Sequence, residues 1–350
     1  AVQVLKEGEV QGSDVAAHSA GVLDIRTNIL ADTDALYLTA IDKYGHELWR
    51  WTFPVNKLNQ QTEQLSPLSS RPTYTETEND LTVKANKRTF IFSKKDGQLK
   101  GVSVDNRKIS FANGPRFIGA RRADRSLDQF YNHDDEKAKE KDRTYSEFPD
   151  AAVFTKLDVK EDGGNLVVIA NYKLGNLDKA QWTINPSGDL ALDYTYNFSG
   201  VVDLMGIRFD YPEDQVISKR WLGAGPYRVW QNRIHGTQYD VWENDYNDPI
   251  PGETFTYPEF KGYFGNVSWM NIQTKEGTIS LTNETPDAYI GVYQPRDGRD
   301  RLLYTLPESG ISVLNVIPPV RNKVNSTDLC GPSSQPKWVN GPQTGRVIFR

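Results

Sequence analysis

One short segment of the chain combines residue types that bind sugars. Residues 221–233 read Trp-Leu-Gly-Ala-Gly-Pro-Tyr-Arg-Val-Trp-Gln-Asn-Arg. Two glycines and a proline within four positions predict that a strand ends and the chain turns here. Tyr227, Trp230 and Arg233 follow this turn. Aromatic rings stack on the C–H faces of sugars, and a guanidinium donates hydrogen bonds to hydroxyl groups. The alternative is that these aromatic side chains pack in the core, where large apolar groups usually lie.

The charge of the chain argues against a nucleic-acid partner. The 350 residues include 46 acidic and 41 basic residues, a net charge of −5, and no long run of one sign. A nucleic-acid arm or a polybasic membrane patch would need such a run. No apolar stretch is long enough to cross a bilayer, so we expect no membrane partner. No glycine-rich phosphate loop is present, and we expect no cofactor.

The cysteine and histidine residues predict neither disulfides nor a metal site. A single cysteine, Cys330, excludes an intrachain disulfide, and none of the four histidines has metal-ligand spacing to another His or Cys. No signal peptide is visible, so we expect a mature protein or a piece of a longer one. The compartment stays open, with a bacterial periplasmic or extracellular setting favoured.

The N-terminal part predicts a small β-sandwich. Residues 35–41 and 47–53 alternate between apolar and polar types around a loop that contains glycine, and residues 22–29 resemble an earlier strand. We interpret residues 1–56 as an immunoglobulin-like sandwich that is short for a complete one. Residues 57–75 are rich in Gln, Ser, Thr and Pro and predict a linker.

Residues 76–350 predict one large antiparallel sandwich. Strand patterns follow one another every eight to fifteen residues, and helical periodicity is nearly absent. An Asp-Gly turn joins residues 89–93 to residues 99–103, and Asn185-Pro-Ser-Gly188 joins residues 180–184 to residues 190–196. The predicted fold class is therefore all-β.

Several segments, taken in order, resemble the C-terminal domain of glycoside hydrolase family 2 β-galactosidases. They are residues 113–115, 182–190, 205–209, 222–233 and 257–269. Their order and spacing make the match more specific than any one of them. Two departures, one extra residue within 227–233 and an insertion over 241–255, place galactose specificity in doubt.

The resemblance implies a galactose-mutarotase-like supersandwich that supports a catalytic barrel. In such enzymes two glutamates on a (β/α)₈ barrel cleave the glycoside. No part of this chain has the alternating strand–helix pattern, so the barrel would lie upstream of Ala1. The chain alone is expected to hydrolyse nothing and to contain no catalytic residue. Its expected partners are that barrel and a β-galactoside-type glycan. The residues implied at the sugar or the barrel are Tyr227, Arg228, Trp230, Arg233, Trp242, Trp269 and Trp338.

Three alternatives stay open at this level. Ser280-Leu-Thr-Asn-Glu284 resembles the family's acid/base element, but we interpret it as a strand end because the barrel around it is missing. An aldose 1-epimerase on the same fold would need a His acid and a Glu base. His235 with Glu259, or with Glu243 as a substitute, is the candidate pair. A stand-alone carbohydrate-binding protein is the third possibility.

Overall fold

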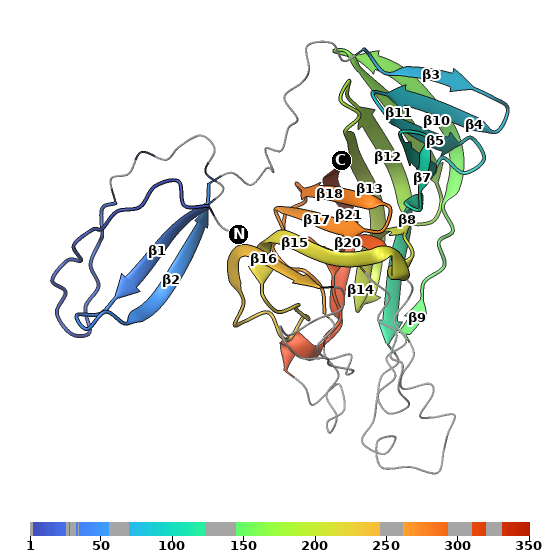
Figure 1. Ribbon diagram of the computed structural model, residues 1–350. Coiled ribbons are helices and arrows are strands. Elements are labelled where there is room, and N and C mark those ends of the chain that lie inside the picture. The colour runs from blue at the N-terminus through green and yellow to red at the C-terminus, as the bar shows by residue number, and fades with distance from the viewer. Residues whose placement is uncertain are drawn as a thin grey trace. The chain divides into compact units, whose positions relative to one another are not determined.

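The computed structural model describes residues 3–25, 28, 33, 35–55, 70–122, 145–245, 262–292, 310–319 and 331–350 (Figure 1). The chain forms two compact units, Ala1–Gln61 and Thr62–Arg350. Within the described residues, regular structure consists of antiparallel strands and two single-turn 3₁₀ helices, Glu213–Gln215 and Pro332–Ser334. The predicted all-β class is confirmed.

The described residues of the first unit contain one β-hairpin. Strands β1 (Ala35–Ile41) and β2 (Glu47–Pro54) pair antiparallel, as their alternating sequence predicts. The strand predicted over residues 22–29 is wrong for the described residues, since none of residues 22–25 or Asn28 is in a strand. Val22 is 89% exposed and therefore lacks the buried face that stabilises a strand. The immunoglobulin-like character of this unit stays a prediction.

A nine-stranded antiparallel sheet forms one layer of the second unit. Its strands, in spatial order, are β10 (Val153–Asp162), β11 (Asn165–Lys173), β12 (Leu177–Ile184), β13 (Leu190–Val202), β21 (Lys337–Phe349), β18 (Gly277–Asn283), β17 (Trp269–Thr274), β15 (Val216–Gly225) and β16 (Gln238–Asp245). The C-terminal strand β21 lies in the middle, between β13 and β18. Residues far apart in the sequence therefore meet on this sheet.

A ten-stranded antiparallel sheet forms the other layer. Its main path is β19 (Tyr289–Gly291), β20 (Ile311–Val316), β14 (Leu204–Asp210), β8 (Ala112–Arg122), β6 (Leu99–Val104), β5 (Arg88–Ser93), β4 (Asp80–Ala85) and β3 (Thr73–Glu76). Short strands β7 (Arg107–Ile109) and β9 (Tyr145–Glu147) pair with β6 and β8. Strand β3 begins at Thr73, within the residues expected to form a linker, because it pairs with β4.

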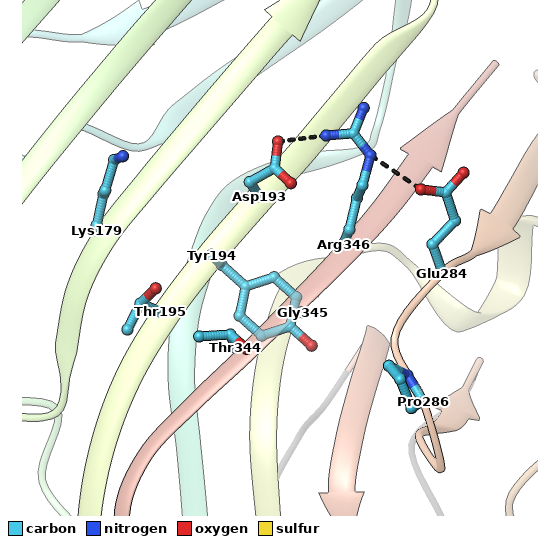
Figure 2. A pocket seen from close by; sticks show the side chains of 9 residues that line it. All are labelled: Lys179, Asp193, Tyr194, Thr195, Glu284, Pro286, Thr344, Gly345 and Arg346. Carbon is cyan, nitrogen blue, oxygen red and sulfur yellow. Dashed lines mark hydrogen bonds and ion pairs between the residues drawn. The ribbon is translucent and has the colours of Figure 1, made fainter.

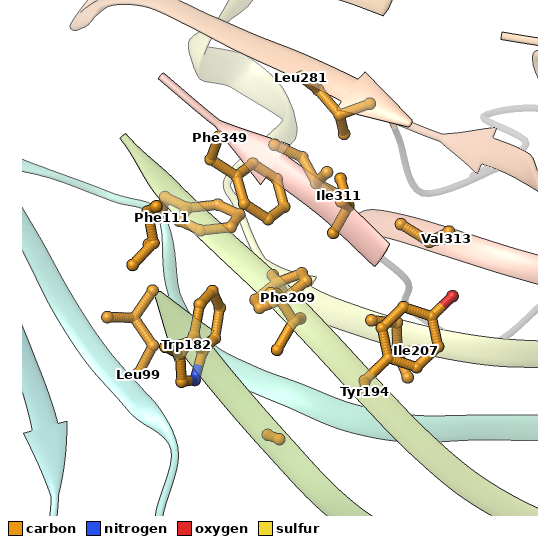
Figure 3. Packing of buried hydrophobic residues seen from close by; sticks show 14 of the residues in the cluster. Leu99, Phe111, Trp182, Tyr194, Ile207, Phe209, Leu281, Ile311, Val313 and Phe349 are labelled. Atoms are coloured by element: carbon orange, nitrogen blue, oxygen red, sulfur yellow. The ribbon is translucent and has the colours of Figure 1, made fainter. Parts of the chain in front are cut away.

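The two sheets pack around an aromatic core (Figure 3). Phe209 of the ten-stranded sheet meets Trp182 and Phe349 of the nine-stranded sheet, with ring centroids 6.0 and 5.4 Å apart. All three side chains are buried. Their contacts are edge-to-face, which aromatic rings favour. Successive side chains of a strand point to opposite faces, so the period of two in the sequence determines which residues of each strand face this core.

A second apolar cluster lies on the other face of the ten-stranded sheet. Ile118 of β8 and Leu204 of β14 belong to it, whereas Phe117 and Met205 belong to the main core. Adjacent residues of a strand point to opposite faces, so this sheet is buried on both sides here. The cover includes Trp230, which comes from the segment that follows β15.

Candidate functional site

Strand β15 continues through the glycines of residues 221–233, the segment predicted to contact a sugar. The sequence predicts that the strand cannot pass Gly223 and Gly225, yet β15 ends only at Gly225, and the turn follows at Pro226. The missing side chains explain this correction. A Cβ on Gly223 would lie 3.0 Å from the Cα of Val267, and one on Gly225 would lie 2.4 Å from the ring of Trp242. The glycines therefore permit close approach by neighbouring segments.

The turn separates the predicted sugar-contacting residues into exposed and buried sets. Tyr227 is 47% exposed and Arg233 is also exposed. Trp230 is only 4% exposed and packs edge-to-face on Tyr263, with centroids 5.6 Å apart. Arg228 is buried with its guanidinium carbon 5.5 Å from the ring centroid of Phe264. Within this chain, Trp230 and Arg228 are therefore buried, as the core-packing alternative predicts, and are not exposed to a sugar.

The other three tryptophans that were predicted at the sugar or the barrel also differ in solvent accessibility. Trp242 is half-buried, packs against the main core and donates from its indole N–H to the carbonyl of Gln238 at 3.1 Å. Trp269 is 4% exposed, with the guanidinium of Arg220 5.9 Å from its ring. Trp338, near the start of β21, is 71% exposed. Among the predicted residues, Trp338 and Tyr227 are the aromatic groups most accessible to a sugar.

Side-chain amides tie the turn to the segment that precedes Trp338. Gln231 Nε2 donates to the carbonyls of Ser333 at 3.0 Å and Gln335 at 2.6 Å. Asn232 Nδ2 donates to Ser334 Oγ at 3.0 Å. Gln231 is nearly buried, and a buried amide that is hydrogen-bonded strengthens the local structure. These hydrogen bonds bring residues 231–232 to the chain only three to five positions before Trp338. Sequence reasoning did not single out Gln231 or Asn232.

The proposed epimerase pair is not assembled within the described residues. Glu259 lies outside them, as do residues 257–261 of the segment 257–269 that carries the resemblance. His235 and Glu243 are both exposed. General acid–base catalysis needs two groups within hydrogen-bond reach of one substrate. No hydrogen bond joins His235 to Glu243 in the part of the chain that the structure describes.

A polar depression lies elsewhere, over strands β12, β13, β21 and the end of β18. It has a volume of about 320 Å³. Figure 2 shows its lining: Lys179, Asp193, Tyr194, Thr195, Glu284, Pro286, Thr344, Gly345 and Arg346. Burial raises the pKa of Tyr194 to about 12, so its phenol stays neutral at ordinary pH.

Arg346 joins the two carboxylates of the depression. Its Nη1 lies 2.5 Å from Asp193 Oδ2, and its Nε lies 3.0 Å from Glu284 Oε2 (Figure 2). Burial acts to lower the pKa of Arg346, but hydrogen bonds and charge attraction from both carboxylates outweigh it, and the net shift is upward. The guanidinium therefore stays charged and compensates both acids. A glycosidase instead needs one protonated carboxylic acid and one free carboxylate.

Glu284 directly follows strand β18, as we interpreted from the sequence. The alternation of β13 and β21 places Asp193 and Arg346 on the face away from the core. The pairing of Asp193 with Arg346 is visible only in the register of these strands. No local signal in the sequence identifies it.

In the part of the chain that the structure describes, no three His, Cys, Asp or Glu side chains lie close enough together to hold a metal ion. The same residues contain no helix with the length and apolar character needed to span a bilayer.

Comparisons with solved structures find similar proteins at low identity. Galactose 1-epimerase from Lactobacillus acidophilus matches with a TM-score of 0.45 and 10% identity, over 80% of this chain and 98% of that one. An aldose epimerase homologue from C. elegans matches with a TM-score of 0.35 and 6% identity, over 79% and 98%. A putative mutarotase from Salmonella typhimurium matches with a TM-score of 0.33 and 9% identity, over 82% and 94%.

Comparison with sequence families shows which family the chain belongs to. No curated protein matches the chain significantly. The family described as beta galactosidase small chain matches residues 84–316, which is most of the second unit and more than half of the chain. The chain therefore belongs to the beta galactosidase small chain family.

Proposed function

We infer that this chain is a non-catalytic component of a β-galactosidase-type glycoside hydrolase of family 2. It would assemble with a catalytic barrel and contribute to the wall of its substrate cleft. Family membership carries the inference. The arrangement of Asp193 and Glu284 around Arg346 supports it, because both carboxylates are engaged by one cation.

The carbohydrate contact is proposed at the exposed aromatic residues. Trp338 and Tyr227 present accessible rings, and Arg233 adds an exposed guanidinium. The hydrogen bonds of Gln231 restrain the chain before Trp338, which reduces the entropy lost when a ligand orders this region. A β-linked, galactose-type sugar is the proposed ligand. Trp230 and Trp269 would support this surface from within rather than contact the sugar.

The test has two parts. The purified chain alone, incubated with a nitrophenyl β-galactoside, is expected to release no nitrophenol, and steady release by homogeneous protein would refute the proposal. Adding the chain to the large chain of a two-chain β-galactosidase, purified without its small chain, is expected to produce activity. No association between the two chains would also count against it.

A stand-alone carbohydrate-binding protein is the second candidate, favoured by the exposure of Trp338. It predicts saturable galactoside binding by the isolated chain, lost in Trp338→Ala. The proposed assembly predicts that binding requires the barrel. Optical rotation of fresh α-galactose, followed with the chain present, tests epimerase activity in the same experiment.

A further inference from the structure

The hairpin of the first unit has two chemically different faces. Leu36 pairs with Phe53, Leu38 with Trp51 and Ala40 with Trp49. Directly paired residues of antiparallel strands point to the same side, so these six side chains form one apolar face. The residues are Leu36, Leu38, Ala40, Trp49, Trp51 and Phe53, and we call them the hairpin apolar face.

The centre of the opposite face of the hairpin is polar and internally bonded, and Ile41 adds an exposed apolar side chain at its end. Arg50 lies over the ring of Tyr37 at 5.8 Å and donates to Thr39 Oγ1 at 3.3 Å. It also forms an ion pair with Glu47 at 2.9 Å. This face is built to remain in water, and a sheet with one polar and one apolar face normally buries the latter.

The hairpin apolar face remains exposed in this structure. Trp49, Trp51 and Phe53 are 54%, 44% and 47% exposed. Aromatic side chains bury about 150–250 Å² each, so roughly 200–400 Å² of apolar surface is left on these three residues. This area approaches that of the largest apolar patch on a typical monomer, which is often functional, and it is a substantial part of the roughly 800 Å² that one partner contributes to a stable interface.

The hairpin is held in shape before any partner arrives. The Asp42 carboxylate accepts hydrogen bonds from the backbone N–H groups of Tyr44 at 2.8 Å and His46 at 2.9 Å. These bonds close the loop between the strands and hold the register that aligns the aromatic residues. A preorganised surface loses less entropy on association.

We propose that the hairpin apolar face packs against the apolar face of a β-sheet in a separate catalytic large chain. This inference rests on the proposed function and adds the surface through which the chains associate. Large residues at every second position form a pleated surface, whose natural complement is another sheet about 10 Å away. An isolated two-stranded hairpin is only marginally stable in water, so the contact would stabilise the first unit as well. The family's designation as a small chain is the reason to place that sheet in a larger partner.

The experiment uses the full chain and the large chain of a two-chain β-galactosidase, purified without its small chain. Trp49→Thr/Trp51→Thr keeps strand-forming residues and removes the aromatic surface. Tyr37→Thr is the matched control, since it removes an aromatic residue from the polar face of the same hairpin. Affinity is measured by calorimetry, and far-UV circular dichroism checks that each variant keeps its strands. The double variant is expected to bind at least ~30-fold more weakly, and the control within about threefold of the wild type.

Tryptophan fluorescence provides a second measurement that does not depend on weakened binding. Trp49 and Trp51 should leave water on association, which shifts their emission to shorter wavelength. Trp49→Phe/Trp51→Phe should retain binding and lose part of that shift. An unchanged shift would overturn the proposed burial of these residues.

The outcomes separate this inference from the proposed function. If the wild-type chain does not bind the large chain, both fail. If it binds and Trp49→Thr/Trp51→Thr binds equally well, only the docking surface is wrong. A wild-type homodimer that becomes monomeric in the double variant, seen by light scattering without the large chain, would assign the face to a second copy and overturn the proposal.

Discussion

The side-chain amide of Gln231 donates a 2.6 Å hydrogen bond to the carbonyl of Gln335, although 104 positions separate the two residues. Together with the bond to Ser333, it connects the turn after β15 to the segment before β21. Two residues that sequence reasoning linked only through a family resemblance, Tyr227 and Trp338, therefore belong to connected parts of the fold. The connection passes through a buried polar side chain.

Replacing Gln231 should loosen this connection. Gln231→Ala leaves two carbonyls without their donor, so we expect a loss of about 1–3 kcal/mol in the free energy of unfolding. Hydrogen exchange at the amides of Ser334 and Gln335, which close the adjacent 3₁₀ turn, should become faster. Gln238→Ala, at an exposed position, is the control. Equal stability of both variants would show that the bonds contribute nothing.

A side chain at Gly225 should disturb the packing of Trp242. The Cβ of Gly225→Ala would lie 2.4 Å from the indole ring, so strand β15 or the ring must move. We expect a destabilisation of about 1–3 kcal/mol in urea denaturation, typical of overpacking. Gly101→Ala is the matched control, because a Cβ there meets no atom within 4 Å. A Gly225→Ala variant as stable as the control would contradict the close approach.

Trp182 should be among the most costly core positions. It is fully buried between Phe92 and Phe209, with ring centroids 5.9 and 6.0 Å away. Truncation to alanine leaves a large cavity, and we expect a loss of about 3–5 kcal/mol. Trp338→Ala, at a residue that is 71% exposed, should change stability by less than about 0.5 kcal/mol. Thermal and urea unfolding of the two variants provide the comparison.

The hairpin of the first unit should weaken in acid. Backbone hydrogen bonding, first from His46, lowers the pKa of Asp42 from its ordinary value of 3.8. The folded state therefore favours the charged carboxylate, so the stabilisation is present above pH 3.8 and disappears as pH falls through the lowered pKa. The amide proton shifts of Tyr44 and His46 should titrate with a midpoint below 3.8. Asp42→Asn should abolish that titration, and a midpoint at or above 3.8 would be inconsistent with these hydrogen bonds.

Glu284 should be dispensable for turnover. It directly follows strand β18 and forms an ion pair with Arg346, so in the assembled enzyme Glu284→Gln is expected to leave turnover nearly intact. Stability should change by no more than about 1 kcal/mol, because the ion pair is partly exposed. Initial rates on a nitrophenyl β-galactoside measure the effect. A decrease of several orders of magnitude would identify Glu284 as catalytic.

The strands were predictable because strand formation depends on local pattern. Residues 35–41, 81–85 and 190–196 largely alternate between apolar and polar types, residues 166–170 form a continuous apolar run, and each segment lies in an observed strand. The exception, residues 22–25, has apolar residues but no partner strand. Hydrophobic residues indicate a strand only where another segment covers one face, and that condition is not local.

The turn after β15 shows that the sequence alone could not decide which side chains of a turn are buried. Trp230 and Tyr227 lie three positions apart in a segment without periodicity, so no pattern assigns them to the interior or to solvent. Trp230 is buried because the outer face of strands β8, β14 and β20 requires a cover, and this turn supplies it. Tyr227 is left exposed on the same turn.

By itself, the sequence determined an all-β chain, which residues of a strand share a face, and a family resemblance over its larger part. Side-chain direction repeats every two residues in any strand, so this information is contained in each segment. Only the tertiary structure decided that Arg346 lies between Asp193 and Glu284, and that Gln231 holds the segment before Trp338. These contacts join strands and turns far apart in the chain, and their formation depends on which distant segments pair and pack together.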